Sequence, residues 1–188
     1  MGRLLCAALA LLAGCATLEP APPTPPLAQP LLTSFQIAGR ISVRNGTEGF
    51  SGNLTWRHVN DEDEFVILTP LGQGVARIIK NAAGVSLEMP DQALVHAQDA
   101  ETLTQQTLGF ALPLSGLPHW VQAQPIEVDA PQRRNPNGTL DQLTEQGWQI
   151  DYLSYQAVNA LQLPGKVFME NATLKLRLIV DAWQVPAP

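Results

Sequence analysis

The sequence predicts a mainly β protein in which short strands follow one another in a curled antiparallel sheet. Three observations support this fold class. Apolar and polar residues alternate with a period of two over most of the chain, turn residues recur about every 8–12 positions, and helical patterns are confined to one central stretch. A meander of this kind forms a curled sheet or a barrel.

The first two strands are predicted in Phe35–Arg44 and Phe50–His58, joined by the turn "NGTEG". Each strand has an apolar face, with Phe35, Ile37, Ile41 and Val43 in the first and Phe50, Leu54 and Trp56 in the second. The acidic run Asp61–Glu64 follows, and we interpret it as a solvated hairpin tip. It lacks the glycine and the terminal glutamate of an EF-hand loop, so we assign no metal to it.

The sheet continues through short strands and is interrupted by two helices. Further strands are predicted at Phe65–Leu68, Val75–Lys80, Val85–Met89 and Ala93–Ala97. Asp99 is expected to cap a first helix, which has Leu103, Thr107 and Phe110 along one side. Ser115 is expected to cap a second helix, with Pro118 in its first turn and Trp120 as an apolar anchor.

Strand patterns return after the polar excursion Asp129–Gly138. Trp148, Ile150 and Tyr152 alternate with polar residues, which predicts a strand. A hairpin with its turn at 171–173 then ends the chain.

The N-terminus has the layout of a secretory signal. Arg3 precedes an apolar run that is too short to span a bilayer, which needs about 20 residues. The sequence Leu12-Ala13-Gly14-Cys15 resembles the bacterial lipobox, so we predict a signal peptide over residues 1–14 and an acylated Cys15. Residues 15–30 then form the lipidated cysteine and a proline-rich tether, and residues 31–188 form a single domain. Ala16 follows the cysteine where an Asp would signal inner-membrane retention, which favours the outer membrane.

Composition and motifs exclude several function classes. The net charge is −6 and no basic patch is evident, which argues against a nucleic-acid partner. His58, His96 and His119 are isolated from one another and from cysteine at any metal-ligand spacing. No nucleophile motif and no dinucleotide fingerprint occur, so we predict neither an enzyme nor a cofactor. With 45% hydrophobic and only 15% charged residues, many apolar side chains must fill a core or line a cavity.

The turn "TPLGQG" carries a leucine where a turn between strands normally has Asn, Asp or Gly. Pro70 stiffens the approach to Leu71, Gly72 and Gly74 free the exit, and no charge lies between Thr69 and Ala76. Leu71 either packs back onto the core or is available to touch lipid.

Several stretches together resemble the LolB family of outer-membrane lipoproteins. They are "GRISV", Trp56, "FVILTPLGQGVARI", "LTQQTLGFALPLSGLPHWVQAQP", "GWQIDY" followed by Tyr155, "LQLP" and "LKLRLIVDAWQV". These stretches extend over nearly all of the chain that follows the tether. The polar excursion Asp129–Gly138 is the part that matches the family least.

The resemblance implies a half-open antiparallel β-barrel, with short helices as a lid over an apolar cavity. It implies a monomeric receptor, anchored in the outer membrane by its lipid and facing the periplasm. Such a receptor takes client lipoproteins from a LolA-like periplasmic carrier and inserts them into the outer membrane. It also implies a membrane-insertion loop, here Pro70, Leu71 and Gly72. Inward alternation suggests these cavity-lining residues, although it predicts plain core residues equally well: Ile37, Ile41, Leu54, Trp56, Phe65, Ile67, Leu103, Phe110 and Trp120.

Three alternatives remain open. A structural or assembly-factor lipoprotein would bind a protein partner at the outer membrane without taking up lipid, and it would share the lipobox, the tether and the sheet. An envelope hydrolase would need a catalytic set that the sequence lacks. A soluble carrier of the same fold is disfavoured by the lipobox at Leu12–Cys15.

Overall fold

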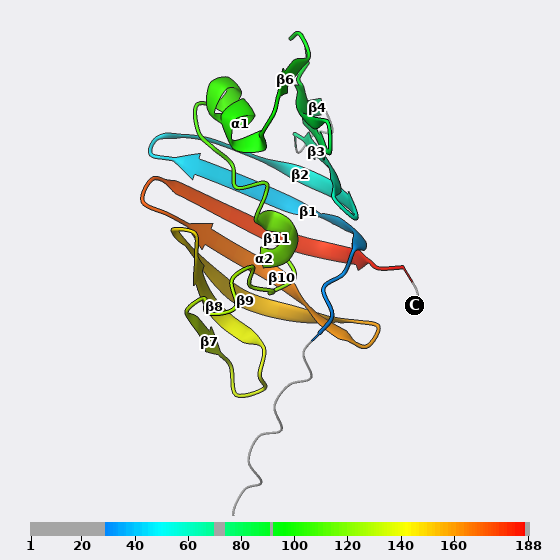
Figure 1. Cartoon of the computed structure of the whole chain (residues 1–188), viewed down its shortest axis with the longest axis vertical. Coiled ribbons are helices and arrows are strands. Elements are labelled where there is room, and N and C mark those ends of the chain that lie inside the picture. The colour runs from blue at the N-terminus through cyan, green and yellow to red at the C-terminus, as the bar shows by residue number, and fades with distance from the viewer. Residues whose placement is uncertain (1–28, 70–73, 91, 187–188) are drawn as a thin grey trace, which may run out of the picture.

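The computed structural model describes residues 29–69, 74–90 and 92–186. In this part of the chain, eleven strands form one antiparallel sheet, and two short helices lie on its concave face (Figure 1). The sheet is curled but not closed, because its two edge strands, β6 and β7, do not pair with each other. The prediction of a mainly β, half-open barrel with short covering helices is confirmed.

The strands fall into two sets separated by the helices. The first set is β1 (Ser34–Asn45), β2 (Glu48–Val59), β3 (Glu62–Leu68), β4 (Gly74–Asn81), β5 (Gly84–Glu88) and β6 (Val95–Ala97). The second set is β7 (Gln132–Arg134), β8 (Leu140–Glu145), β9 (Trp148–Val158), β10 (Leu161–Glu170) and β11 (Leu174–Gln184). Their order in space is β6-β5-β4-β3-β2-β1-β11-β10-β9-β8-β7, so the first and last strands meet in the middle of the sheet.

Gly39 allows β1 and β11 to pair closely at the centre of the sheet. The register between these strands shifts between Ala38 and Gly39. A Cβ added at Gly39 would lie 2.1 Å from the carbonyl oxygen of Ile179, a distance that no side chain can accommodate without backbone movement. The glycine of the "GRISV" motif therefore permits the bulge through which the two halves of the sheet join.

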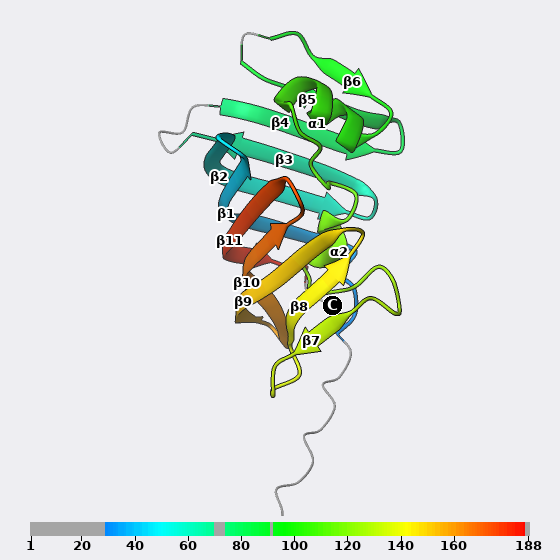
Figure 2. The same cartoon turned by 90° about the vertical axis from the view of Figure 1, so that its left-hand side faces the viewer.

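The two helices lie on the concave face because of this strand order. Since β6 and β7 are opposite edges of the sheet, the chain between them must cross it, and it does so with α1 (Ala100–Leu108) and α2 (Leu117–Trp120) (Figures 1 and 2). Asp99 caps α1 as predicted, since its carboxylate accepts a hydrogen bond from the Thr102 backbone N–H at 2.7 Å. This bond lowers the pKa of Asp99.

The predicted cap of the second helix is wrong. The residue before α2 is Gly116 rather than Ser115, and no side chain caps that end. Pro118 does lie in the first turn, as expected. Since α2 has only four residues, contacts of its apolar side chains hold it in place more than its own backbone bonds do.

The polar stretches were predicted least well. The excursion at 129–138 contains the edge strand β7, whose three residues are all exposed, and β8 follows it. The acidic run at 61–64 is not wholly solvated, because Asp63 is 1% exposed. Among the described residues, no helix is long and apolar enough to cross a membrane.

Candidate functional site

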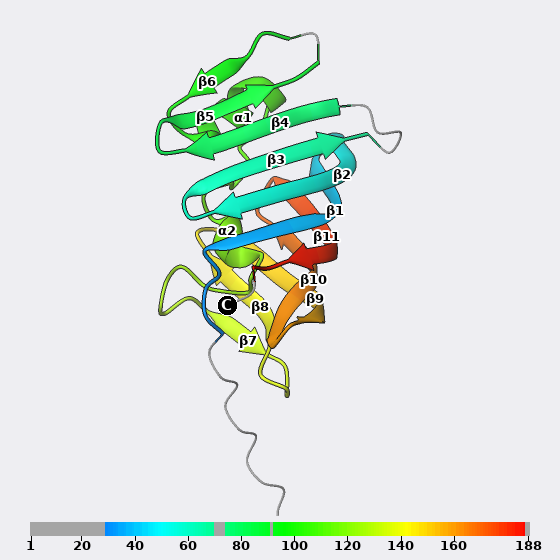
Figure 3. The same cartoon turned by 90° about the vertical axis from the view of Figure 1, so that its right-hand side faces the viewer.

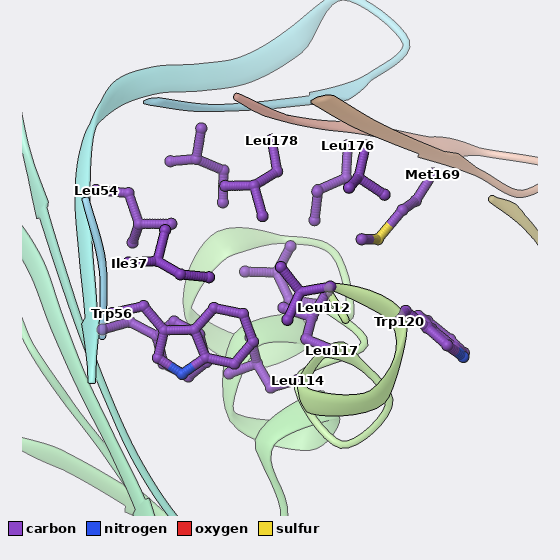
Figure 4. Close-up of a cluster of buried hydrophobic side chains, with 14 of the residues drawn as sticks. Ile37, Leu54, Trp56, Leu112, Leu114, Leu117, Trp120, Met169, Leu176 and Leu178 are labelled. Carbon is purple, nitrogen blue, oxygen red and sulfur yellow. The ribbon is translucent and has the colours of Figure 1, made fainter. Parts of the chain in front are cut away.

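The concave face of the sheet and the chain that crosses it enclose an entirely apolar space. We call residues 109–127 the covering segment. Figure 4 shows its leucines directed at the side chains of the sheet. The space is lined by Ile41, Leu54, Trp56, Phe65, Ile67, Ile78, Leu112, Leu114, Leu117, Leu176 and Leu178. Each strand contributes alternate residues, so the lining follows from the period of two that the sequence displays.

All nine residues predicted as cavity lining are buried, but they do not all border this space. Five of them do, and these come from the first three strands: Ile41, Leu54, Trp56, Phe65 and Ile67. The other four pack in the core around it: Ile37, Leu103, Phe110 and Trp120. Contact of any of these side chains with lipid stays a prediction.

The covering segment fills most of the interior. Leu112, Leu114 and Leu117 lie between the two helices and at the start of α2, and they are 2–4% exposed. The free space that remains is about 20 Å³, little more than one water molecule requires. The sequence prediction took the helical part of the lining to be Leu103, Phe110 and Trp120, and it missed these leucines. The signal was present, since no charged residue lies between Phe110 and Pro118.

The C-terminal part of the covering segment is held by hydrogen bonds to β8 and β9. The buried carboxylate of Glu145 accepts from the Trp120 indole N–H at 2.5 Å, and from the backbone N–H groups of Ile126 and Glu127 at 2.8 and 2.6 Å. The Tyr152 hydroxyl donates to the Trp120 carbonyl oxygen at 2.9 Å. Burial raises the pKa of Tyr152 well above its ordinary value, so the hydroxyl stays protonated and remains a donor.

The N-terminal part of the covering segment has weaker polar contacts. The Leu112 backbone N–H donates to the Thr104 hydroxyl at 2.9 Å, and that hydroxyl donates to the Ala100 carbonyl at 2.8 Å. Ser115 lies 3.4 Å from the Glu101 carboxylate, at the outer limit of a hydrogen bond. Apolar contacts therefore hold this part more than hydrogen bonds do.

The chain that enters the domain also contacts the covering segment. The Gln122 side chain accepts from the Leu32 backbone N–H at 2.7 Å and donates to the Leu32 carbonyl at 3.2 Å. Gln29, in the predicted tether, exchanges hydrogen bonds with Gln162 of β10, and its carbonyl accepts from Gln124. The end of the predicted tether thus rests on the domain.

A second buried carboxylate lies at the other side of the interior. Asp63 accepts from the Trp56 indole at 2.9 Å and from His58 Nδ1 at 2.7 Å, and Lys80 lies 3.3 Å away. The ring of Phe35 stacks on that of His58, with centroids 4.8 Å apart. Burial alone raises the pKa of Asp63, but the hydrogen bonds from His58 and Trp56 and the nearby charge of Lys80 outweigh burial, so the pKa is lowered. Its stabilising effect is therefore present above the ordinary pKa of an aspartate and is lost in acid.

The alternation of β3 could have revealed Asp63, which precedes Phe65 and Ile67 by two and four residues and so points inward. In the described ranges, no three His, Cys, Asp or Glu side chains are grouped so that they could hold a metal ion. Cys15, Pro70, Leu71 and Gly72 lie outside the described residues.

Residues 33–183 match the family model of the outer membrane lipoprotein LolB, which covers most of the chain. The chain belongs to the LolB family. An outer-membrane lipoprotein LolB of Thiobacillus denitrificans is 40% identical over 174 residues, which span 92% of this chain and 91% of the relative. Another, from Azoarcus sp. strain BH72, is 35% identical over 189 residues, with 98% of this chain and 95% of the relative covered.

The fold has a counterpart among solved structures. A LolA superfamily protein from Nitrosomonas europaea superposes with a TM-score of 0.50 at 11% identity, covering 85% of this chain and 89% of that one. At that identity the likeness concerns the fold alone. The family assigns this chain to outer-membrane lipoprotein localisation. LolB proteins are localisation factors and do not form a known enzyme family.

Proposed function

We propose that this LolB-family chain receives lipoproteins from a LolA-like periplasmic carrier, shelters their acyl chains beneath the covering segment and releases them into the outer membrane. One observation carries the proposal: the interior is lined only by apolar side chains, and three of these belong to a segment that is weakly held at one end. An acyl chain needs an apolar wall and a way in. Displacing Leu112, Leu114 and Leu117 provides both.

The free energy lost when the leucines leave the interior is similar to the free energy gained when an acyl chain enters it. Burying one leucine side chain contributes about 1.5–3 kcal/mol, so removing three of them from the interior costs roughly 5–9 kcal/mol. Each methylene of an entering chain returns about 0.8 kcal/mol, so roughly 6–11 methylenes offset the loss. An acyl chain longer than this binds with a modest net gain in free energy. Modest affinity suits a protein that must give its cargo away.

Transfer then needs no nucleotide and no covalent step. Acyl chains move from carrier to receptor to bilayer when each site binds them more favourably than the one before. A difference of about 1.4 kcal/mol gives a tenfold bias at each step. The covering segment sets the affinity of the receptor, which lies between those of the carrier and the bilayer, because its leucines compete with the acyl chain for the same apolar side chains.

We further propose that acylated Cys15 anchors the monomeric domain to the outer membrane on the periplasmic side, and that Leu71 enters the bilayer during release. Transfer of one leucine into hydrocarbon contributes roughly 1.5–3 kcal/mol, too little to anchor the protein but enough to orient it. The chain leaves β3 at Leu68 and re-enters the sheet at Gly74, so the insertion loop joins two strands of the sheet that forms the interior.

Uptake of a fluorescent fatty acid tests the proposal directly. The mature chain carrying Cys15→Ala is titrated with the probe, and saturable binding is expected. A filled interior also favours a second candidate function, an assembly factor that binds a protein partner without lipid. That candidate predicts no saturable uptake, and such a result would overturn the proposal.

The insertion loop is tested separately from uptake. Leu71→Glu is expected to accept lipoproteins from the carrier normally and to fail in membrane incorporation, because it places a charge where hydrocarbon contact is needed. Leu71→Met is the matched control and should incorporate normally. Normal incorporation by the Glu variant would show that Leu71 does not enter the bilayer.

A further inference from the structure

The convex face of the sheet, opposite the helices, gathers basic side chains on three adjacent strands. We call this set the basic face: Arg40, Arg44, Lys166, Lys175 and Arg177. Strand register brings them together, since Arg44 is opposite Lys175, and Ile179 is opposite both Arg40 and Lys166. The sequence has no basic run, because the five residues come from strands β1, β10 and β11.

The basic face is exposed and only partly neutralised. The side chains of Arg40 and Lys175 are 57% and 62% exposed, and they pair with Asp181 at 2.9 Å and Glu170 at 3.1 Å. Exposed pairs of this kind are held weakly, so these cations can exchange partners. Three cations have no carboxylate partner among the described residues: Arg44, Lys166 and Arg177. Arg177 instead lies over the Phe168 ring, 5.0 Å from its centroid.

The adjoining convex surface of β2 to β5 lacks such a surplus. There Arg57 and Arg77 both pair with Glu64, at 3.3 and 2.7 Å, and Arg77 also approaches Glu88 at 3.8 Å. Among the described residues, three of the four lysines and arginines without a carboxylate partner thus lie on one part of the sheet, and the fourth is Arg134 of edge strand β7. The chain as a whole has a net charge of −6. Solubility of a sheet face requires polar residues, but it does not require that unpaired cations gather on one part of the face.

The basic face looks toward the side on which β3 ends and β4 begins. In Figure 2 these strand ends lie at the left, on the side of the sheet away from α2, and Figure 3 shows the same arrangement from the opposite direction. Leu68, the last residue of β3, is in register with Asn53, which is in register with Arg40. A flat surface that meets these strand ends would meet the basic face as well.

We propose that the basic face binds anionic phospholipid headgroups at the bilayer surface. The inference takes its orientation from the proposed function, in which the loop after Leu68 enters the membrane. Lysine and arginine reach phosphates on long stems, and their attraction to an anionic surface extends over about one Debye length, ~10 Å. A broad sheet face that exposes separated cations suits a plane of headgroups better than it suits the shaped surface of an acidic protein.

Vesicle co-sedimentation of the mature chain carrying Cys15→Ala tests the proposal without the lipid anchor. We expect tighter binding to vesicles of phosphatidylcholine with phosphatidylglycerol than to phosphatidylcholine alone, and loss of that preference in high salt. The triple variant Arg44→Gln, Lys166→Gln, Arg177→Gln should bind the anionic vesicles about tenfold more weakly. The matched control, Arg57→Gln, Arg77→Gln, Arg133→Gln, removes the same charge from other surfaces and should change binding less than about twofold.

Two results would overturn the proposal. In one, the triple variant and its control bind anionic vesicles equally. In the other, the triple variant keeps its vesicle binding but loses acceptance of lipoproteins from the carrier, which would assign the face to an acidic protein partner. Thermal unfolding confirms that both variants are folded. Fatty-acid uptake separates this test from the proposed function, because the triple variant should take up the probe normally.

Discussion

The two ends of the covering segment are held in different ways. The C-terminal end is fixed by directional bonds to a buried carboxylate, with three donors on Glu145 and a fourth bond from Tyr152 to the Trp120 carbonyl. At the N-terminal end, Leu112 donates to Thr104 and Gly109 exchanges hydrogen bonds with Gln105 of α1, while Ser115 only approaches Glu101. Between these contacts, the end is held by leucines that fill the interior. Polar bonds break abruptly when their geometry is lost, whereas leucine contacts can be replaced by any apolar group.

This difference defines which part of the segment can leave the interior. An acyl chain can take over the contacts of Leu112, Leu114 and Leu117, but it cannot accept the hydrogen bonds that hold Trp120 in place. We therefore expect the segment to open at its leucine end and to stay attached at its tryptophan end.

Replacing the carboxylate should release the fixed end. Glu145→Ala removes the acceptor of the buried Trp120 indole and of the backbone N–H groups of two exposed residues, Ile126 and Glu127, and we expect the free energy of unfolding to fall by about 3 kcal/mol. Urea unfolding measures the loss. Glu127→Ala is the control, since it lies in the same loop, keeps its backbone donor and should change stability by less than about 0.5 kcal/mol. Equal effects of the two substitutions would contradict a special role for Glu145.

Gly116 sits between the two ends and packs against Trp120. A Cβ added there would lie 2.7 Å from two carbon atoms of the Trp120 ring, which is 1% exposed and bonded to Glu145 and so cannot move freely. Gly116→Ala should therefore lower the free energy of unfolding by about 1–3 kcal/mol. The exposed neighbour provides the control, and Ser115→Ala should be nearly neutral. A stable Gly116→Ala variant would mean that the tryptophan is not held as tightly as its bonds suggest.

Tyr152, at the fixed end, should make the free energy of unfolding fall as the pH becomes alkaline. Because burial raises the pKa of Tyr152 above its ordinary value, its contribution to stability is complete below about pH 10 and is lost as the pH rises through the raised value. In the Tyr152→Phe variant, the free energy of unfolding should fall less steeply as the pH rises through this range. At neutral pH, that free energy should be about 1 kcal/mol lower than in the unmodified chain. Burial raises the pKa of Tyr155 as well, so Tyr155→Phe should also weaken the alkaline pH dependence. It is the comparison for uptake, since Tyr155 donates to the Leu140 carbonyl and not to the covering segment. Fatty-acid uptake should respond to the first substitution and not to the second.

The hydrogen bond at the N-terminal end should affect stability no more than the Tyr152 bond does. Thr104→Val keeps the shape of the side chain and removes the acceptor of the Leu112 N–H, so a loss of about 1 kcal/mol is expected. Uptake of the fatty-acid probe should become faster, because this bond belongs to the end that opens. Thr107→Val in the same helix should leave the uptake rate unchanged. Slower uptake by the Thr104 variant would place the opening elsewhere.

Sequence reasoning recovered the sheet because strand alternation is a local property. In two strands, alternate residues face the interior as their spacing predicts: Phe35, Ile37, Ile41 and Val43 in β1, and Trp148, Ile150 and Tyr152 in β9. It recovered the cap at Asp99 for the same reason. It missed β7 because an edge strand with every residue exposed has no apolar face to detect.

The interior could be predicted only in part. Alternation identified inward residues on the strands, but it could not say which inward residues would border free space and which would be covered. That depends on where the crossing segment lies, and so on the meeting of Leu112 with Leu176 and Leu178 from the far end of the chain. The burial of Glu145 likewise depends on the Trp120 donor, which comes from the crossing segment.

Hydrogen exchange of the mature chain carrying Cys15→Ala, with and without a saturating fatty acid, tests the central claim most directly. The account predicts that ligand increases exchange at the amides of residues 109–117, while the amides of Ile126 and Glu127, which donate to Glu145, keep their protection. Unchanged protection over 109–117 in the presence of bound ligand would contradict it, because the leucines would then still occupy the space that the acyl chain is supposed to fill.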